Sequence, residues 1–181
     1  FDIASHEFSH HVIWQTINSK RGDALIIHEG YADYFTYAAT DDPYLGESSA
    51  LYRDYIRSAV APRSIRYDDP LLSPHSHDRG EVLSALLWEL RLEIGSSFDQ
   101  VVYRSLAYLN GYSELSDVML GLIQADRDLN PIAVSETYYG LHGTNKCSLI
   151  QSMIERGFVG HLTDINPEGC DLTLPTENHN N

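Results

Sequence analysis

Residues 2–15 read DIASHEFSHHVIWQ, and in this stretch two histidines, His6 and His10, stand four positions apart. On a helix, residues four positions apart project from the same face one turn from each other, so two imidazoles can reach one metal ion. Glu7 lies at the edge of that face, where its carboxylate can touch a water held by the metal. The His-Glu-x-x-His pattern also arises by chance, so it indicates a metal site only when a third ligand accompanies it.

A third ligand is available in residues 26–35, which read IIHEGYADYF. Glu29 follows His10 after eighteen intervening residues, and a chain that folds back here brings the second helix against the first. Three protein ligands with one open position are typical of a catalytic zinc site. Asp33 lies one turn after Glu29 and can accept a hydrogen bond from the outer nitrogen of a ligating histidine. We therefore predict that His6, His10 and Glu29 bind zinc.

The composition argues against two classes of interaction. The chain has 181 residues, which is one domain by length, and its net charge at pH 7 is -14. A surface this acidic repels phosphate, which argues against a nucleic-acid partner. No apolar run approaches the length that a membrane-spanning helix needs, so we expect no membrane span. An acidic chain that begins at Phe1 rather than Met fits a processed or truncated product, and we expect a secreted (extracellular or periplasmic) protein.

Cys147 and Cys170 are the only cysteines. They can close a disulfide that contributes about 3 kcal/mol in the chain-entropy model, or they can remain two free thiols. Two cysteines indicate the redox compartment only weakly, so both alternatives stay open.

Hydrophobic periodicity of the helical kind runs through almost the whole chain and predicts a mainly α-helical unit over residues 1–165. No stretch shows a convincing strand-like alternation. Residues 166–181 are polar and interrupted by proline, so we expect an extended or frayed tail. The predicted helices span residues 2–17, 24–40, 48–60, 81–94, 97–110, 113–129 and 144–158, with an irregular loop over 61–79 and N-caps at Ser113 and Thr144.

The segments that carry the motif resemble a known family. DIASHEFSHHV followed by HEGYADYF is similar to the gluzincin zinc metallopeptidases, which include thermolysin-like and fungalysin-like enzymes. The later stretches HDRGEVLSALLWEL, GLIQADRDLN and CSLIQSMIERGFVG resemble the fungalysin-like group. The resemblance covers residues 2–160 and implies the helical subdomain of a zincin catalytic domain. The family's upstream β-rich subdomain, which aligns the substrate backbone, is absent from this chain and is an expected partner.

The resemblance implies a role for each residue of the two motifs. His6, His10 and Glu29 would be the zinc ligands, and Asp33 would be the partner of His6. Glu7 would be the general base that takes a proton from water as the water attacks the peptide bond.

A histidine that stabilises the transition state is also implied, and His77, three residues before Gly80, matches it. His75 is the alternative in the same loop. His28 stands where the family usually has an asparagine, so it either supports the ligands in that residue's place or competes for the metal. His11 projects about 100° away from the motif face and is expected at the surface or behind the ligands. Three further histidines without partners at metal spacing are expected to be structural or exposed: His142, His161 and His179.

Calcium is a second metal that the resemblance implies. Asp2 matches a carboxylate that binds calcium in some thermolysin-like enzymes. Other acidic residues lie nearby in the sequence, namely Asp41, Asp42 and Glu47.

The function that the resemblance implies is zinc-dependent hydrolysis of peptide or protein substrates by an endopeptidase. An aminopeptidase-like exopeptidase is one alternative, and it would need a tyrosine such as Tyr67 or Tyr103 to stabilise the oxyanion. The other alternative is a non-catalytic module that keeps the metal to bind a partner or to hold structure. Such a site is usually closed by four ligands and has no need of a base such as Glu7.

The inner faces of the first two predicted helices are expected to be apolar enough to need a partner. This expectation rests on four residues that require burial: Ile3, Ile13, Ile27 and Tyr34.

Overall fold

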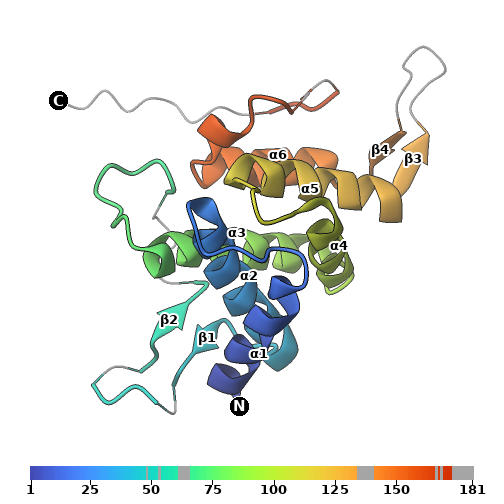
Figure 1. Ribbon diagram of the computed structural model, residues 1–181. Helices are drawn as coiled ribbons and strands as arrows, with labels where there is room; N and C mark the ends of the chain where they lie inside the picture. The colour runs from blue at the N-terminus through green and yellow to red at the C-terminus, as the bar shows by residue number, and fades with distance from the viewer. Residues whose placement is uncertain are drawn as a thin grey trace.

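The computed structural model describes residues 1–47, 49–52, 54–60, 66–133, 141–165, 167 and 169–172. Within them the chain is mainly α-helical, as its periodicity predicts (Figure 1). The helices are α1 (Asp2–Trp14), α2 (Asp23–Thr40), α3 (Ser76–Ile94), α4 (Phe98–Ser105), α5 (Leu115–Leu129) and α6 (Lys146–Glu155), with the 3-10 turns η1 (Leu106–Tyr108) and η2 (Val159–His161). Two short antiparallel pairs accompany them, β1 (Tyr44–Leu45) with β2 (Arg57–Ser58) and β3 (Pro131–Ala133) with β4 (Leu141–Gly143).

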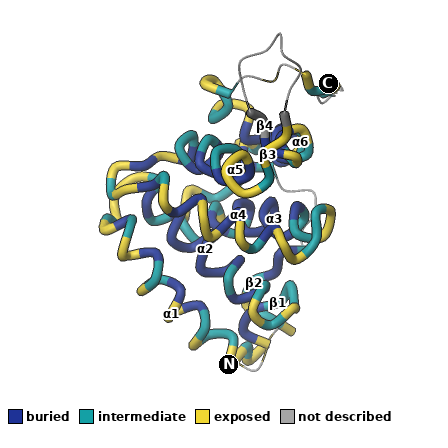
Figure 2. The backbone as a smooth tube through the Cα atoms, turned by 90° about the vertical axis from the view of Figure 1, so that its right-hand side faces the viewer, coloured by how far each residue is buried: buried dark blue, intermediate teal, exposed yellow. Residues whose placement is uncertain are grey.

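Helix α2 is the central element of the core. It packs against both α1 and α3, and its residues are buried over most of its length (Figure 2). Two of its tyrosines reach the core because their hydroxyls find partners there. Tyr31 shares a hydrogen bond with Ser105 at 2.7 Å, and Tyr34 donates to Asp99 at 2.6 Å. A helix that is buried on nearly every side fixes the position of whatever polar residues it carries.

The inner faces of the first two helices were expected to need a partner. This expectation is wrong for three of the four residues on which it rested. Ile13, Ile27 and Tyr34 are fully buried by the chain's own helices, and Ile3 is half-buried. The reason is that the downstream helices, α3 above all, cover α2 on the side that α1 leaves open.

The helix predicted over residues 48–60 is also wrong. The described residues there form turns and β2, in which Arg57 pairs with Leu45 and Ser58 pairs with Tyr44. Leu51 and Tyr52, two apolar residues of this segment, are 86% and 97% exposed. A helical period stabilises a helix mainly when its apolar stripe is buried, and this segment buries none at these positions.

Several helix ends differ from their predicted positions. Helix α3 begins at Ser76 rather than near residue 81, because the His75 side chain caps it by accepting a hydrogen bond from the backbone N–H of His77. The N-cap of α5 is Glu114 rather than Ser113, and that of α6 is Asn145 rather than Thr144. Of the predicted loop 61–79, residues 61–65 lie outside the described residues.

Helices α2 and α3 cross at two glycines. A Cβ atom added to Gly80 would lie 2.6 Å from the Cβ of Glu29, and one added to Gly30 would lie 2.7 Å from Leu83 Cδ2. Both distances are far below van der Waals contact, so only glycine lets the two helices approach this closely. The crossing brings the start of α3 beside Glu29.

Cys147 in α6 and Cys170 form a disulfide, which settles the alternative that the sequence left open. The bridge ties the segment after η2 to α6. Most of the predicted tail 166–181 lies outside the described residues. Among the helices that the structure describes, none combines the length and apolar character that crossing a membrane requires.

Candidate metal centre

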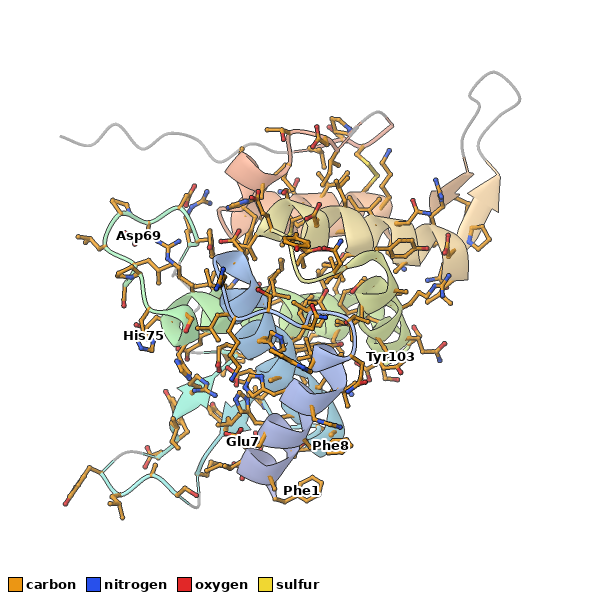
Figure 3. The ribbon with its side chains drawn as sticks, in the orientation of Figure 1. Phe1, Glu7, Phe8, Asp69, His75 and Tyr103 are labelled. Atoms are coloured by element: carbon orange, nitrogen blue, oxygen red, sulfur yellow. A yellow bond between two sulfur atoms is a disulfide. The ribbon has the colours of Figure 1, made fainter. Side chains whose placement is uncertain are left out.

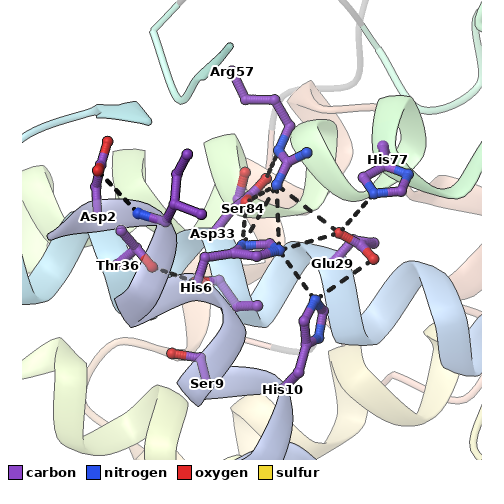
Figure 4. Close-up of polar contacts among 12 residues, drawn as sticks. Asp2, His6, Ser9, His10, Glu29, Asp33, Thr36, Arg57, His77 and Ser84 are labelled. Carbon is purple, nitrogen blue, oxygen red and sulfur yellow. Dashed lines mark hydrogen bonds and ion pairs between the residues drawn. The ribbon is translucent and has the colours of Figure 1, made fainter. Parts of the chain in front are cut away.

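Helices α1 and α2 bring the three predicted zinc ligands together. His6 and His10 lie one turn apart on α1, and Glu29 faces them from α2 (Figure 4). The Nε2 atoms of His6 and His10 are 3.0 Å apart. Glu29 Oε2 lies 3.5 Å from His6 Nε2, and Glu29 Oε1 lies 3.6 Å from His10 Nε2. In the described part of the chain, these three residues form the one group of ligating side chains that could hold a metal ion.

The separations of these atoms fit tetrahedral zinc coordination. Bonds of about 2.0–2.2 Å from zinc to nitrogen and oxygen put neighbouring ligand atoms about 3.3–3.6 Å apart. The three observed distances, 3.0, 3.5 and 3.6 Å, lie close to that range. Glu29 Oε2 is buried and has no hydrogen-bond partner among the described residues. A buried oxygen left in this state costs free energy that a bound cation would offset.

Asp33 holds the His6 ring in the orientation that a ligand needs. The Asp33 carboxylate is fully buried, and its Oδ1 lies 2.8 Å from His6 Nδ1. A proton on Nδ1 that is donated to this carboxylate leaves Nε2 with the free lone pair toward His10 and Glu29. Arg57 clamps the same carboxylate from β2, donating from Nε at 2.8 Å and from Nη2 at 2.9 Å. The predicted role of Asp33 therefore has the contact that it requires.

The electrostatics of the three ligands differ from one another. Burial alone would lower the pKa of His6, but its ion pairs with Asp33 and Glu29 raise it to about 9. For His10, burial and the neighbouring charge of His6 lower the pKa. Burial would raise the pKa of Glu29, but its ion pair with His6 and the charges of His77 and His10 lower it. Near neutral pH and without metal, the centre thus holds a charged His6, a neutral His10 and a carboxylate.

The structure brings His77 to the centre and leaves His75 outside it. His77 stands in the first turn of α3, and its Nε2 lies 3.3 Å from Glu29 Oε2 (Figure 4). His75 precedes the helix and stacks on His77 with ring centroids 5.0 Å apart. The glycine crossing at Gly80 explains why a residue three positions earlier reaches Glu29. Of the two candidates for transition-state stabilisation, only His77 has a described contact with a ligand.

Glu7 lies beside the ligands without being one of them. Its side chain is exposed on α1 (Figure 3). Together with His10 and Glu29, Glu7 lines a pocket of about 360 Å³. Glu7 therefore shares a pocket with two of the candidate ligands, and its role as a general base stays a prediction.

Two other histidines near the centre have separate roles. His28 makes a 2.7 Å hydrogen bond through Nε2 to the carbonyl oxygen of Ile17, and burial lowers its pKa. That contact ties the turn between α1 and α2 to α2, so His28 neither supports nor competes with the ligands through Nε2. His11 is exposed on α1, as predicted, and lines the same pocket as Glu7.

Arg57 is the residue of the centre that the sequence did not reveal. Its Nη2 lies 3.3 Å from His6 Nε2 and 4.0 Å from Glu29 Oε2, in addition to its two bonds to Asp33. Arg57 is in the segment that was expected to be helical, 24 positions after Asp33. The signal for such a residue is Asp33. A buried carboxylate usually has a paired cation, and the only partner expected for Asp33 was a histidine.

The other candidate residues have contacts of their own. Asp2 accepts hydrogen bonds from the backbone of Ile3 and Gly46, Asp41 pairs with Arg91, and Asp42 accepts from the backbone of Tyr44. These four contacts are all within the protein and do not test calcium binding, which stays a prediction. His161 packs edge-on against Tyr67. The His142 side chain and His179 lie outside the described residues.

Neither tyrosine considered for an exopeptidase contacts a candidate ligand in the described structure. Tyr67 stacks on Phe158 at 4.6 Å, with Arg79 over its ring. Tyr103 projects from α4, at the opposite end of α3 from His75, and is 63% exposed (Figure 3).

Comparison with models of known protein families finds none that matches this chain, and comparison with curated proteins finds no match either.

Proposed function

We propose that this chain is the helical part of a zinc-dependent metallopeptidase of the gluzincin type that hydrolyses peptide or protein substrates. The observation that supports this most is the triangle of His6 Nε2, His10 Nε2 and the Glu29 carboxylate, with sides of 3.0 to 3.6 Å. The same residues are the ligands that the sequence resemblance implies. Asp33 supports the proposal further, because an outer carboxylate on a ligating histidine is a usual companion of catalytic zinc.

A zinc ion held by these three residues would supply a nucleophilic water at neutral pH and would polarise the scissile carbonyl. Glu7 would take the proton from that water as the water attacks, and would then deliver it to the leaving amine. The exposed side chain of Glu7 and the pocket that it shares with His10 and Glu29 support this assignment.

Two cationic or hydrogen-bonding groups face the side of Glu29 away from His10. His77 Nε2 lies 3.3 Å from Glu29 Oε2 and would donate to the oxyanion that develops on the carbonyl oxygen. Arg57 would hold the Asp33 carboxylate in place beside His6 while the reaction proceeds. Loss of one oxyanion donor typically lowers kcat by about 10²–10³-fold.

An endopeptidase is favoured over the two alternatives. The aminopeptidase alternative lacks support, since Tyr67 and Tyr103 have their described contacts in other parts of the fold. The non-catalytic alternative leaves the exposed Glu7 beside the ligands without a role. A β-rich subdomain that aligns the substrate, and a secreted or periplasmic location, belong to the same proposal.

Glu7→Gln tests the function because glutamine has almost the same shape but cannot accept the proton. We expect the zinc-loaded variant to keep its metal and, when the chain is joined to its upstream β-rich subdomain, to lose hydrolysis of an internally quenched peptide by about 10²–10⁴-fold, the usual contribution of general-base catalysis. Glu93→Gln, which changes an exposed glutamate of α3, is the matched control and should retain activity. Equal hydrolysis by the wild-type protein and Glu7→Gln would overturn the proposal.

A further inference from the structure

The pocket beside the candidate metal centre continues well past the ligands. On α1, Glu7, His10 and Trp14 line it, and these positions span about 10 Å along a helix axis. Helices α1 and α2 run antiparallel here, since His6 meets Asp33, His10 meets Glu29, and the ring of Trp14 lies 5.8 Å from that of His28. The pocket therefore leads from the metal ligands toward the turn that joins the two helices.

Lys20, in the turn between α1 and α2, closes this end of the pocket. It lines the same cavity as Glu7 and Glu29, and its Nζ lies 6.0 Å from the centroid of the Trp14 ring. That distance is the outer range of a cation–π contact, which orients the ammonium group over the indole. Leu25 adds an apolar wall.

A lysine in this position is unusual for this chain. The net charge is -14, and Lys20 and Lys146 are the only lysines. Lys146 is buried, whereas Lys20 is exposed. Lys20 is therefore the one solvent-accessible ammonium group on a lysine side chain of this acidic chain, and it faces the pocket of the candidate centre.

The charges around the pocket favour an anionic occupant once a divalent ion is bound. With the histidines counted as uncharged, the formal charges there are -1 for Glu7, -1 for Glu29 and +1 for Lys20. Adding a divalent cation gives a sum of +1. The apolar body of a side chain would pack on Trp14 and Leu25, and its terminal group would meet Lys20.

We propose that this pocket is a substrate subsite that selects a carboxylate, carried by a glutamate or aspartate side chain or by the free C-terminus of a peptide, with Lys20 as the selecting group. The subsite rests on the proposed peptidase function for its biological meaning. Binding to it, however, can be measured without any turnover.

The binding experiment uses zinc-loaded Glu7→Gln protein, so that peptides are not cleaved, and follows Trp14 fluorescence. The second tryptophan, Trp88, is buried and serves as a constant background. Acetylated and amidated pentapeptides with one glutamate, moved along the sequence, are compared with their glutamine counterparts. A glutamine peptide with a free C-terminal carboxylate distinguishes the two sources of the anion.

We expect one glutamate peptide, or the free-acid peptide, to bind about tenfold more tightly than its neutral counterpart, the lower range for a charge-assisted hydrogen bond. Lys20→Gln should abolish this preference, and Lys20→Arg should preserve most of it. Arg21→Gln removes the same charge one residue away, outside the pocket lining, and should leave the preference unchanged. Trp14→Phe should remove most of the fluorescence signal.

The outcomes separate the subsite from the enzyme. Equal affinity for charged and neutral peptides, or an equal loss of preference in Lys20→Gln and Arg21→Gln, would overturn the subsite while leaving peptide hydrolysis untouched. In the other case, Lys20 selects the carboxylate but Glu7→Gln hydrolyses peptides as fast as the wild type. That pair of results would keep the subsite and overturn the proposed peptidase function.

Discussion

At the scale of single residues, Asp33 is the side chain on which the centre depends beyond its ligands. It is fully buried between His6 Nδ1 and the guanidinium of Arg57. Removing its charge would leave the partly buried Arg57 against a neutral partner and would loosen the His6 ring. The contacts therefore predict that metal affinity depends on a residue that does not touch the metal.

We predict that Asp33→Asn lowers zinc affinity by about 10–100-fold, the usual effect of losing such a supporting carboxylate. Competition with a chromogenic chelator measures this. Asp41→Asn is the matched control, because Asp41 also pairs with an arginine but lies at the end of α2. An Asp33→Asn protein with wild-type affinity would show that the contact is structural only.

The pKa values of the ligands predict how zinc binding depends on pH. Ligation requires a neutral imidazole, but the pKa of His6 is raised to about 9, so metal-free His6 carries a proton at pH 7. The pKa of His10 and that of Glu29 are both lowered, so neither adds a proton to be displaced at pH 7. We expect zinc to release about one proton per chain and to bind more tightly as pH rises from 7 toward 9. Calorimetry in two buffers of different ionisation enthalpy measures the released proton, and pH-independent affinity over this range would contradict the assignment.

The residues of the centre differ in how far the sequence could predict them. His6, His10 and Asp33 follow from helical spacing, which fixes the relative direction of side chains one turn apart. Glu29 needed only the assumption that the chain folds back after α1. Arg57 could not be predicted, because a two-residue strand carries no periodic signal and the pairing of β2 with β1 is a tertiary event.

At the scale of elements, the α2–α3 crossing determines where His77 lies. Gly80 meets Glu29 and the backbone of Gly30, and neither of these can move as the end of a flexible side chain could. The sequence predicted both helices but not their contact. It therefore placed His77 in a loop on spacing alone, whereas the structure has it in the first turn of α3.

We predict that Gly80→Ala destabilises the fold by about 1–3 kcal/mol, the usual cost of overpacking, even though alanine favours a helix over glycine. It should also weaken zinc binding, because Glu29 is the residue that must give way. Urea unfolding and zinc titration measure the two effects. Gly160→Ala is the control, since a Cβ there meets nothing within 4 Å. A Gly80→Ala protein as stable as Gly160→Ala would contradict the close crossing.

At the scale of the whole molecule, the fold is a helical core that carries the candidate metal centre near its N-terminal end. The hydrophobic pattern predicted most of this core, because most of the predicted helices bury an apolar stripe. It failed where the chain leaves the core, as in residues 48–60. The disulfide between Cys147 and Cys170 joins the segment after η2 to α6, a link that contributes about 3 kcal/mol in the chain-entropy model.

The central claim is that His6, His10 and Glu29 hold one zinc ion, and the metal content of the purified chain tests it most directly. After loading with zinc at neutral pH and exhaustive dialysis, mass spectrometry should find close to one zinc per chain. His6→Ala and Glu29→Ala should retain almost none, while His11→Ala should retain the wild-type amount. A wild-type chain that keeps no zinc, or a Glu29→Ala chain that keeps as much as the wild type, would contradict the account.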